Sequence, residues 1–227
     1  MKMVFVSGWG QSAKPGECFQ EFFSSTKLIA PEQLNSWDAE GLSALVDEVE
    51  PVVLVGWSAG GMLAIDYSLN YPERVSALVL LSSSARFTST EGYEFEGEAL
   101  GVELSELRLL KKQLLRDREL ALGGFQKRVE SENTELDEYI FGISEQSLQQ
   151  GLEFLESFDV RKSLGQITCP TLILCGLKDK VISPKDSMYL ASKISGSRLK
   201  IFPEGRHSLF GGQVVKELKS FLEDEIT

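Results

Sequence analysis

Three side chains of this 227-residue sequence have the chemical types that a nucleophilic serine needs. Ser58 stands at the centre of GWSAG, residues 56–60, and a serine hydroxyl is a poor nucleophile at neutral pH unless a nearby base takes its proton. Histidine is suited to that task, and the sequence contains a single one, His207. A carboxylate then fixes the imidazole tautomer, and Asp179 is the candidate. Together these residues predict acyl transfer through a serine nucleophile.

Each of these residues also has a simpler interpretation. Ser58 could only cap the helix that follows it, and a lone histidine is more often structural than catalytic. Asp179 could be a turn-forming aspartate, and Asp159 and Asp186 are rival acids, although neither directly follows a core strand. The chemical interpretation is favoured because the predicted elements bring Ser58, Asp179 and His207 to one edge of a sheet.

The segments around Ser58 predict a strand that turns directly into a helix. An unbroken apolar run, PVVLV, precedes GWSAG, and a helical segment over residues 59–70 follows until Pro72. Such a turn holds its apex residue in a strained backbone conformation. Gly56 and Gly60 remove Cβ atoms that would collide where strand and helix pass each other. The serine is therefore placed to attack.

The candidate acid and base also lie in segments that directly follow predicted strands. Asp179 comes just after the apolar run TLILCG, and His207 lies in a glycine-containing loop between the last strand and the last helix. An acyl-transfer site also needs backbone N–H groups that bind the oxyanion, each worth about 3 kcal/mol. We expect these from Ala59, after the nucleophile, and from Trp9 in the loop SGWG, although SGWG could equally be a glycine-rich turn with an anchoring tryptophan.

The order of apolar and amphipathic segments predicts an α/β fold with a mostly parallel central sheet flanked by helices. Leucine-rich and charge-rich stretches interrupt this alternation over residues 86–166. We therefore expect one core formed by residues 1–85 and 167–227, with residues 86–166 as a helical cap inserted into it.

Composition excludes several function classes. The formal net charge of −11 argues against nucleic acid or an anionic membrane as a partner. The apolar run at the start is too short for a signal peptide, and no run of roughly 18 apolar residues occurs, so we expect a cytoplasmic protein. Three cysteines without a CxxC motif support neither a disulfide framework nor a zinc site. The expected chemistry needs no metal or organic cofactor, and we expect a monomer.

The motifs SGWG, GWSAGG, GLKDKVI and GRHSLF resemble those of the α/β-hydrolase family over nearly the whole chain. They are most similar to the pimeloyl-[acyl-carrier protein] methyl ester esterases of biotin synthesis, which typically carry tryptophans at the positions of Trp9 and Trp57. The resemblance implies an α/β-hydrolase fold, with Ser58 as nucleophile, Asp179 as acid and His207 as base. It also implies the amides of Trp9 and Ala59 as oxyanion donors. One position departs from the pattern, because Ser7 replaces the histidine that usually precedes the loop glycine.

The resemblance also implies an ester substrate carried on acyl carrier protein, which is acidic. Residues 108–128 contain seven basic residues and two acidic ones. Leu107, Leu110 and Leu114 recur at helical spacing and should face inward, which turns the intervening basic residues to solvent. The candidate docking residues are Arg108, Lys111, Lys112 and Arg116. An ordinary solvated helix face is the alternative interpretation.

Aromatic residues supply the candidate substrate contacts. Trp9, Trp57 and Phe125 are the predicted binding residues, and Phe87, Phe141 and Phe154 could join them along an apolar channel or simply fill the core. The sequence thus predicts a serine hydrolase for a carboxylic ester. A short-chain carboxylesterase, a thioesterase or a lyase would use the same parts. A non-catalytic binding protein that kept the fold is a further alternative, but it predicts a broken set of catalytic residues.

Overall fold

The core is one parallel sheet of six strands in the order β2-β1-β3-β4-β7-β8. The computed structural model describes residues 1–23, 25–46, 50–130 and 142–226. The strands are β1 (Met3–Val6), β2 (Thr26–Ile29), β3 (Val52–Trp57), β4 (Val75–Leu81), β7 (Thr171–Gly176) and β8 (Arg198–Phe202). Every neighbouring pair in this sheet is parallel, which confirms the predicted α/β class.

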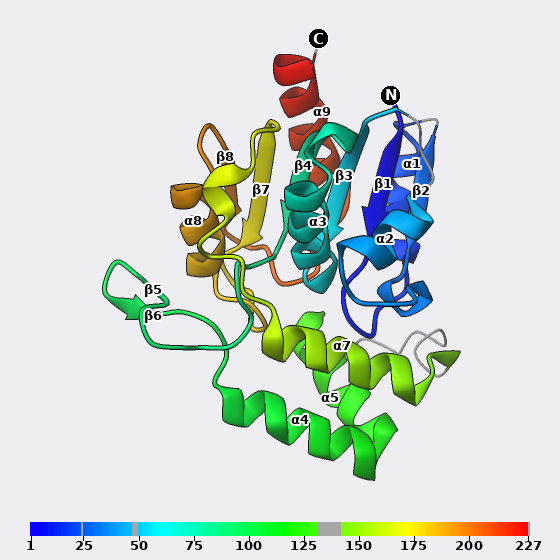
Figure 1. Ribbon diagram of the computed structural model, residues 1–227, viewed down its shortest axis with the longest axis vertical. Helices are drawn as coiled ribbons and strands as arrows, with labels where there is room; N and C mark the ends of the chain where they lie inside the picture. Colours follow the sequence, from blue (N-terminus) through cyan, green and yellow to red (C-terminus); the bar gives the residue numbers. More distant parts are fainter. Residues whose placement is uncertain (24, 47–49, 131–141, 227) are drawn as a thin grey trace.

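Helices cover both faces of the sheet (Figure 1). Helices α2 (Ala39–Leu45) and α3 (Ala59–Asn70) contact each other on one face, and α1 (Glu17–Gln20) contacts α9 (Gly212–Ile226) on the other. Helix α8 (Pro184–Lys193) packs on β7 and β8. Four 3₁₀ turns complete the described core: η1 (Lys14–Gly16), η2 (Pro31–Gln33), η3 (Pro72–Arg74) and η4 (Leu164–Gln166). Among the described residues, no helix combines the length and the apolar character needed to cross a membrane.

Coverage on both faces explains why β3 and β7 are buried at every position and are mostly apolar. All residues of β3 and of β7 are buried, as the unbroken apolar runs predict. The register places Val6 beside Gly56 and Gly56 beside Leu80, so the carboxyl ends of β1, β3 and β4 are aligned. Loops that follow these strands therefore meet at one edge of the sheet.

The segment between β4 and β7 contains a small hairpin and three described helices. Figure 1 shows α4 (Leu104–Arg116), α5 (Arg118–Val129) and α7 (Glu145–Ser157) together beyond the carboxyl ends of the strands. The predicted helical character is confirmed over residues 104–129 and 145–157, whereas residues 86–103 contain the hairpin and no helix. The hairpin of β5 (Glu94–Phe95) and β6 (Glu98–Ala99) was not predicted, because its turn depends on positive φ angles at Glu96 and Gly97 rather than on a β-branched run.

Helix α3 passes β1 and β3 at distances that only glycine permits. A Cβ atom on Gly60 would lie 2.2 Å from the carbonyl oxygen of Val6, and one on Gly56 would lie 2.4 Å from the carbonyl oxygen of Gly60. Backbone oxygens cannot move aside without disturbing β1 or α3. The predicted role of these two glycines is confirmed.

Replacing Gly60 by alanine should therefore destabilise the fold strongly. We expect Gly60→Ala to lower the free energy of unfolding by at least about 2 kcal/mol, or to prevent folding. Gly124→Ala is the matched control, because nothing lies within 4 Å of a Cβ atom at this helical position. Alanine there should stabilise by about 0.5–1 kcal/mol. Urea denaturation of both variants measures the contrast, and equal effects would contradict the steric explanation.

Candidate active site

Ser58 occupies the turn between β3 and α3 in a strained backbone conformation, with φ of +57° and ψ of −122°. Its N–H donates to the carbonyl of Leu81 at 2.9 Å, and its own carbonyl accepts from the Ser83 hydroxyl at 2.9 Å. These bonds fix the serine from β4. Its side chain makes no capping bond to α3 within the described structure, so the interpretation as a simple N-cap is wrong.

The His207 imidazole and the Asp179 carboxylate form a buried contact. The Nδ1 atom of His207 lies 2.8 Å from Oδ2 of Asp179, and each side chain is 1 % exposed. The other carboxylate oxygen accepts the N–H groups of Val181 at 2.7 Å and Ile182 at 3.0 Å. Asp179 thus closes its own turn and holds the imidazole at the same time. The turn-forming interpretation is therefore confirmed, and the role of Asp179 as the catalytic acid stays a prediction.

The two rival acids are engaged elsewhere. Asp159 pairs with Arg86 at 3.0 Å and with Arg161 at 2.7 Å. Asp186 accepts the Tyr93 hydroxyl at 2.5 Å, and burial raises the pKa of this carboxyl to about 6. The structure therefore brings Asp179, rather than either rival, to the histidine.

Trp57 supports the histidine loop from the strand that precedes the serine. Its indole N–H donates to the carbonyl of His207 at 2.8 Å, and the two rings lie 5.7 Å apart. The edge of Trp57 also packs on Phe210 at 5.0 Å. The indole is completely buried, so these contacts give Trp57 a structural role, and its predicted substrate contact stays a prediction.

The SGWG loop lies against the serine. A Cβ atom on Gly8 would be 3.2 Å from that of Ser58. The loop closes as a turn, because the N–H of Gln11 donates to the carbonyl of Gly8 at 3.2 Å. In the described part of the chain, the N–H groups of Trp9 and Ala59 donate to no protein acceptor. The two predicted donors are thus available to a ligand.

Two side chains anchor this loop. The indole N–H of Trp9 donates to the carbonyl of Leu148 in α7 at 2.9 Å. Ser7, which replaces the usual family histidine, is fully buried and donates its hydroxyl to the carbonyl of Ser12 at 2.6 Å. Ser7 therefore braces the loop from inside rather than facing a ligand.

A cleft opens between the inserted segment and the loop that carries Asp179. Its volume is about 340 Å³, and Phe87, Val102 and Val181 are among its walls. A smaller cavity of about 50 Å³ shares these three residues and reaches Phe125. The predicted binding residue Phe125 packs edge-on against Trp9 at 5.0 Å and so links the cleft to the SGWG loop. Phe154 stacks on Trp37 and Phe158 instead, and Phe141 lies outside the described residues.

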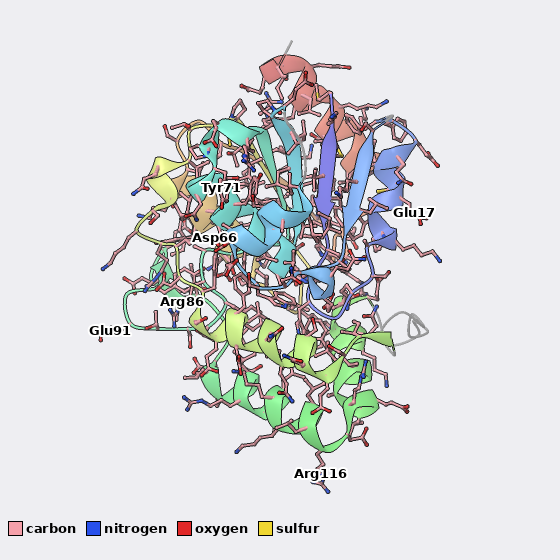
Figure 2. All side chains as sticks on the ribbon, turned by 45° about the vertical axis from the view of Figure 1, so that its right-hand side comes forward. Glu17, Asp66, Tyr71, Arg86, Glu91 and Arg116 are labelled. Carbon is pink, nitrogen blue, oxygen red and sulfur yellow. The ribbon has the colours of Figure 1, made fainter. Side chains whose placement is uncertain are left out.

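Helix α4 presents the predicted basic face. Leu107, Leu110 and Leu114 are buried, and Arg108, Lys112 and Arg116 are exposed, which confirms the predicted orientation. Figure 2 shows Arg116 projecting from the end of the inserted segment that is farthest from the sheet. Lys111 differs from the other three, because it is half-buried and pairs with Glu156 of α7. Arg108 also reaches Glu156, at 3.8 Å.

The hydrogen bond from Trp57 to the histidine loop predicts a measurable stability difference. Trp57→Phe removes the only described donor to a buried carbonyl, and we expect it to cost about 1–3 kcal/mol beyond the effect of ring size. Trp37→Phe is the matched control, because the indole N–H of Trp37 is buried without a partner among the described residues. Guanidinium denaturation compares the two, and an equal loss in both variants would remove the hydrogen bond as the cause.

Known proteins resemble this chain in sequence and in fold. A family model described as serine aminopeptidase, S33 (Hydrolase_4) matches residues 39–213. A pimeloyl-[acyl-carrier protein] methyl ester esterase of Neisseria meningitidis serogroup B (strain H44/76) is 30 % identical over 183 residues, covering 76 % of this chain and 67 % of the relative. A protein of the same name from Aliivibrio salmonicida is 27 % identical over 249 residues, covering 98 % of this chain and 92 % of the relative.

A solved structure extends the likeness to three dimensions. The esterase from Exiguobacterium antarcticum superimposes with a TM-score of 0.73 at 26 % identity, over 99 % of this chain and 90 % of the esterase. The family match, the parallel sheet and the strained turn at Ser58 agree with the resemblance found in the sequence motifs. The chain therefore belongs to the α/β-hydrolase family.

Proposed function

We propose that the protein hydrolyses a carboxylic ester through an acyl-enzyme formed on Ser58. The observation that carries this proposal is the buried pair of His207 and Asp179, which lies next to the strand end where Ser58 is held in strained backbone. A carboxylate at Nδ1 keeps the proton on that nitrogen and leaves Nε2 as the basic atom. Strain at Ser58 exposes the hydroxyl at the N-terminus of α3, where developing negative charge is favoured.

In the first half of the reaction, the Ser58 oxygen attacks the ester carbonyl while Nε2 of His207 takes its proton. The carbonyl oxygen becomes an oxyanion, and the N–H groups of Trp9 and Ala59 bind it. The intermediate collapses when the bond to the alcohol oxygen breaks. His207 returns the proton to that oxygen, and the free alcohol leaves an acyl group on Ser58.

Water completes the cycle by the same route. His207 accepts a proton from water as its oxygen attacks the acyl carbon, and the bond to Ser58 then breaks. The proton returns to the serine oxygen, and a carboxylic acid is released. Asp179 keeps the imidazolium oriented in both halves without itself accepting a proton.

A fluorophosphonate probe tests this assignment. We expect the wild-type protein to be labelled on Ser58, and Ser58→Ala to remain unlabelled and inactive towards a 4-nitrophenyl ester. Asp179→Asn should be folded but about a thousandfold or more slower, because the asparagine side chain favours the wrong imidazole tautomer. A folded wild-type protein that resists labelling would instead support the non-catalytic binding protein.

The substrate that we propose is the methyl ester of a pimeloyl group on acyl carrier protein. The two relatives that carry this activity in their names support it. The cleft beside Asp179 has apolar walls at Phe87, Val102 and Val181 and charged walls at Glu103, Glu106 and Lys180. We further propose that residues 86–166 act as a cap on a core of residues 1–85 and 167–227. The acyl chain would then lie between cap and core, close to Phe87 and Phe125.

The outer face of this cap carries the features expected for carrier-protein docking. Carrier proteins are acidic, and so is this chain as a whole, so encounter requires a local basic surface. Arg108, Lys112 and Arg116 are exposed there. Leu109 and Leu115 are 55 % and 64 % exposed on the same helix, which gives the face apolar contacts as well as charge. Lys111 is committed to Glu156 and contributes less.

Charge reversal on α4 distinguishes carrier-protein docking from catalysis of ester cleavage. The triple variant Arg108→Glu, Lys112→Glu and Arg116→Glu should lower kcat/KM for a carrier-bound methyl ester by about tenfold or more at low salt. It should leave a small free ester unaffected. The matched control reverses three exposed lysines on the sheet edge and core helices, namely Lys27, Lys193 and Lys216.

Both triple variants change the net charge equally, so only position distinguishes them. An equal loss on free and carrier-bound esters, or an equal loss in both variants, would refute docking at α4. Methanol release identifies ester cleavage, whereas a thioesterase would release the carrier thiol.

A further inference from the structure

A glutamate that the sequence motifs do not single out contacts the SGWG loop. Glu32 lies in η2, directly after β2, and its Oε1 atom accepts the N–H of Gly10 at 2.7 Å. Its other carboxylate oxygen, Oε2, is buried and has no hydrogen-bond partner among the described residues. A buried carboxylate that is only half satisfied is costly, and therefore needs an explanation.

The contact falls on the central peptide of the turn. Gly10 has φ of +63°, Trp9 is not among the residues with positive φ, and the N–H of Gln11 closes the turn onto Gly8. This is the pattern of a type II turn, and reversal of its central peptide gives the type I form. Reversal would direct the Trp9 carbonyl oxygen towards Glu32, where an ionised carboxylate, which only accepts hydrogen bonds, repels it. Glu32 therefore favours the type II form of the turn and disfavours the type I form.

Helix α7 restrains the same turn through the tryptophan side chain. The indole of Trp9 donates to Leu148, and the Ser147 hydroxyl donates to the backbone carbonyl of Glu32 at 3.4 Å. A Cβ atom on Gly151 would lie 2.4 Å from the Trp9 ring, so α7 and the turn are in close contact. Glu32 of η2 thus holds the turn through the backbone N–H of Gly10, and α7 holds it through the side chain of Trp9.

Burial of the Glu32 carboxylate costs stability at neutral and basic pH. Burial raises the pKa of Glu32 to about 7, although the N–H groups of Gly10 and of Glu32 itself lower it. The charged side chains of α7, which are Glu145, Glu153 and Glu156, do not contribute to the shift. Because the pKa is higher in the folded state than in the unfolded state, stability falls as pH rises between these two values. The hydrogen bond from Gly10 thus offsets only part of the cost of burying the ionised side chain.

We propose that Glu32 is a positioning residue. By holding the Trp9–Gly10 peptide it fixes the turn as a whole, and with it the preceding Gly8–Trp9 peptide, whose N–H is the proposed oxyanion donor. The proposal rests on the proposed ester hydrolysis. It also explains why Gly10 is not itself an oxyanion donor, because its N–H is already bound to Glu32. Glu32 acts through the turn and touches no reacting atom.

Three variants test it with a short 4-nitrophenyl ester. Glu32→Ala should lower kcat by about 10- to 100-fold, because a donor displaced by a fraction of an ångström loses much of its effect, while KM changes by less than about threefold. Glu32→Gln should keep kcat within about threefold, since the amide oxygen still accepts the N–H of Gly10. Glu40→Ala, an exposed change on α2, is the matched control and should behave as wild type.

The pH dependence of unfolding supplies a second readout. Glu32→Gln should be more stable than wild type at about pH 8, and the difference should shrink towards about pH 5, where the folded wild type has protonated Glu32. A difference that does not vary with pH would contradict ionisation of Glu32 in this site.

The outcomes distinguish this inference from the proposed function. Failure of the wild type to react with a fluorophosphonate would overturn ester hydrolysis itself. Complete labelling of wild type together with full kcat in a folded Glu32→Ala would overturn only the role of Glu32. Equal loss of kcat in Glu32→Ala and Glu32→Gln would also overturn it. If Glu32→Ala does not fold, Glu32→Asp decides, because its shorter side chain keeps the charge but cannot reach Gly10. A wild-type kcat in that variant would refute the proposal.

Discussion

The strained passage of the chain through Ser58 is the constraint on which the rest of the structure depends. A non-glycine residue at positive φ costs about 1–3 kcal/mol and persists only where its surroundings leave no alternative. Here β3 is completely buried in the sheet and α3 begins immediately after the serine, so the chain must reverse within one residue. The glycines at positions 56 and 60 permit that reversal because their backbones touch neighbouring backbone oxygens directly.

The geometry of the proposed catalytic site then follows from the parallel sheet. Loops after β1, β3, β7 and β8 all leave from aligned carboxyl ends, so the proposed oxyanion turn, nucleophile, acid and base come from separate parts of the sequence and meet at one edge. Trp57 joins two of these parts, because the residue just before the nucleophile binds the backbone of the base. The serine turn and the histidine loop therefore behave as one mechanical unit.

Much of this was predictable from local patterns. The apolar runs gave β3 and β7, Pro72 marked the end of α3, and the position of Asp179 after β7 distinguished it from Asp159 and Asp186. The contacts of Trp57 and Glu32 were not predictable, because each joins segments distant in the chain and leaves no periodic pattern. The pairing of Lys111 with Glu156 was missed for the same reason. The substrate and the docking surface stay predictions, since folds of this kind serve many ester chemistries.

The bond between Trp9 and the backbone of α7 also connects the inserted helices to the proposed catalytic site. A ligand that displaced α7 from the core would pull on the indole of Trp9 and tilt the turn beside Ser58. The position of the inserted helices and the aim of the proposed oxyanion donor are therefore linked through one side chain.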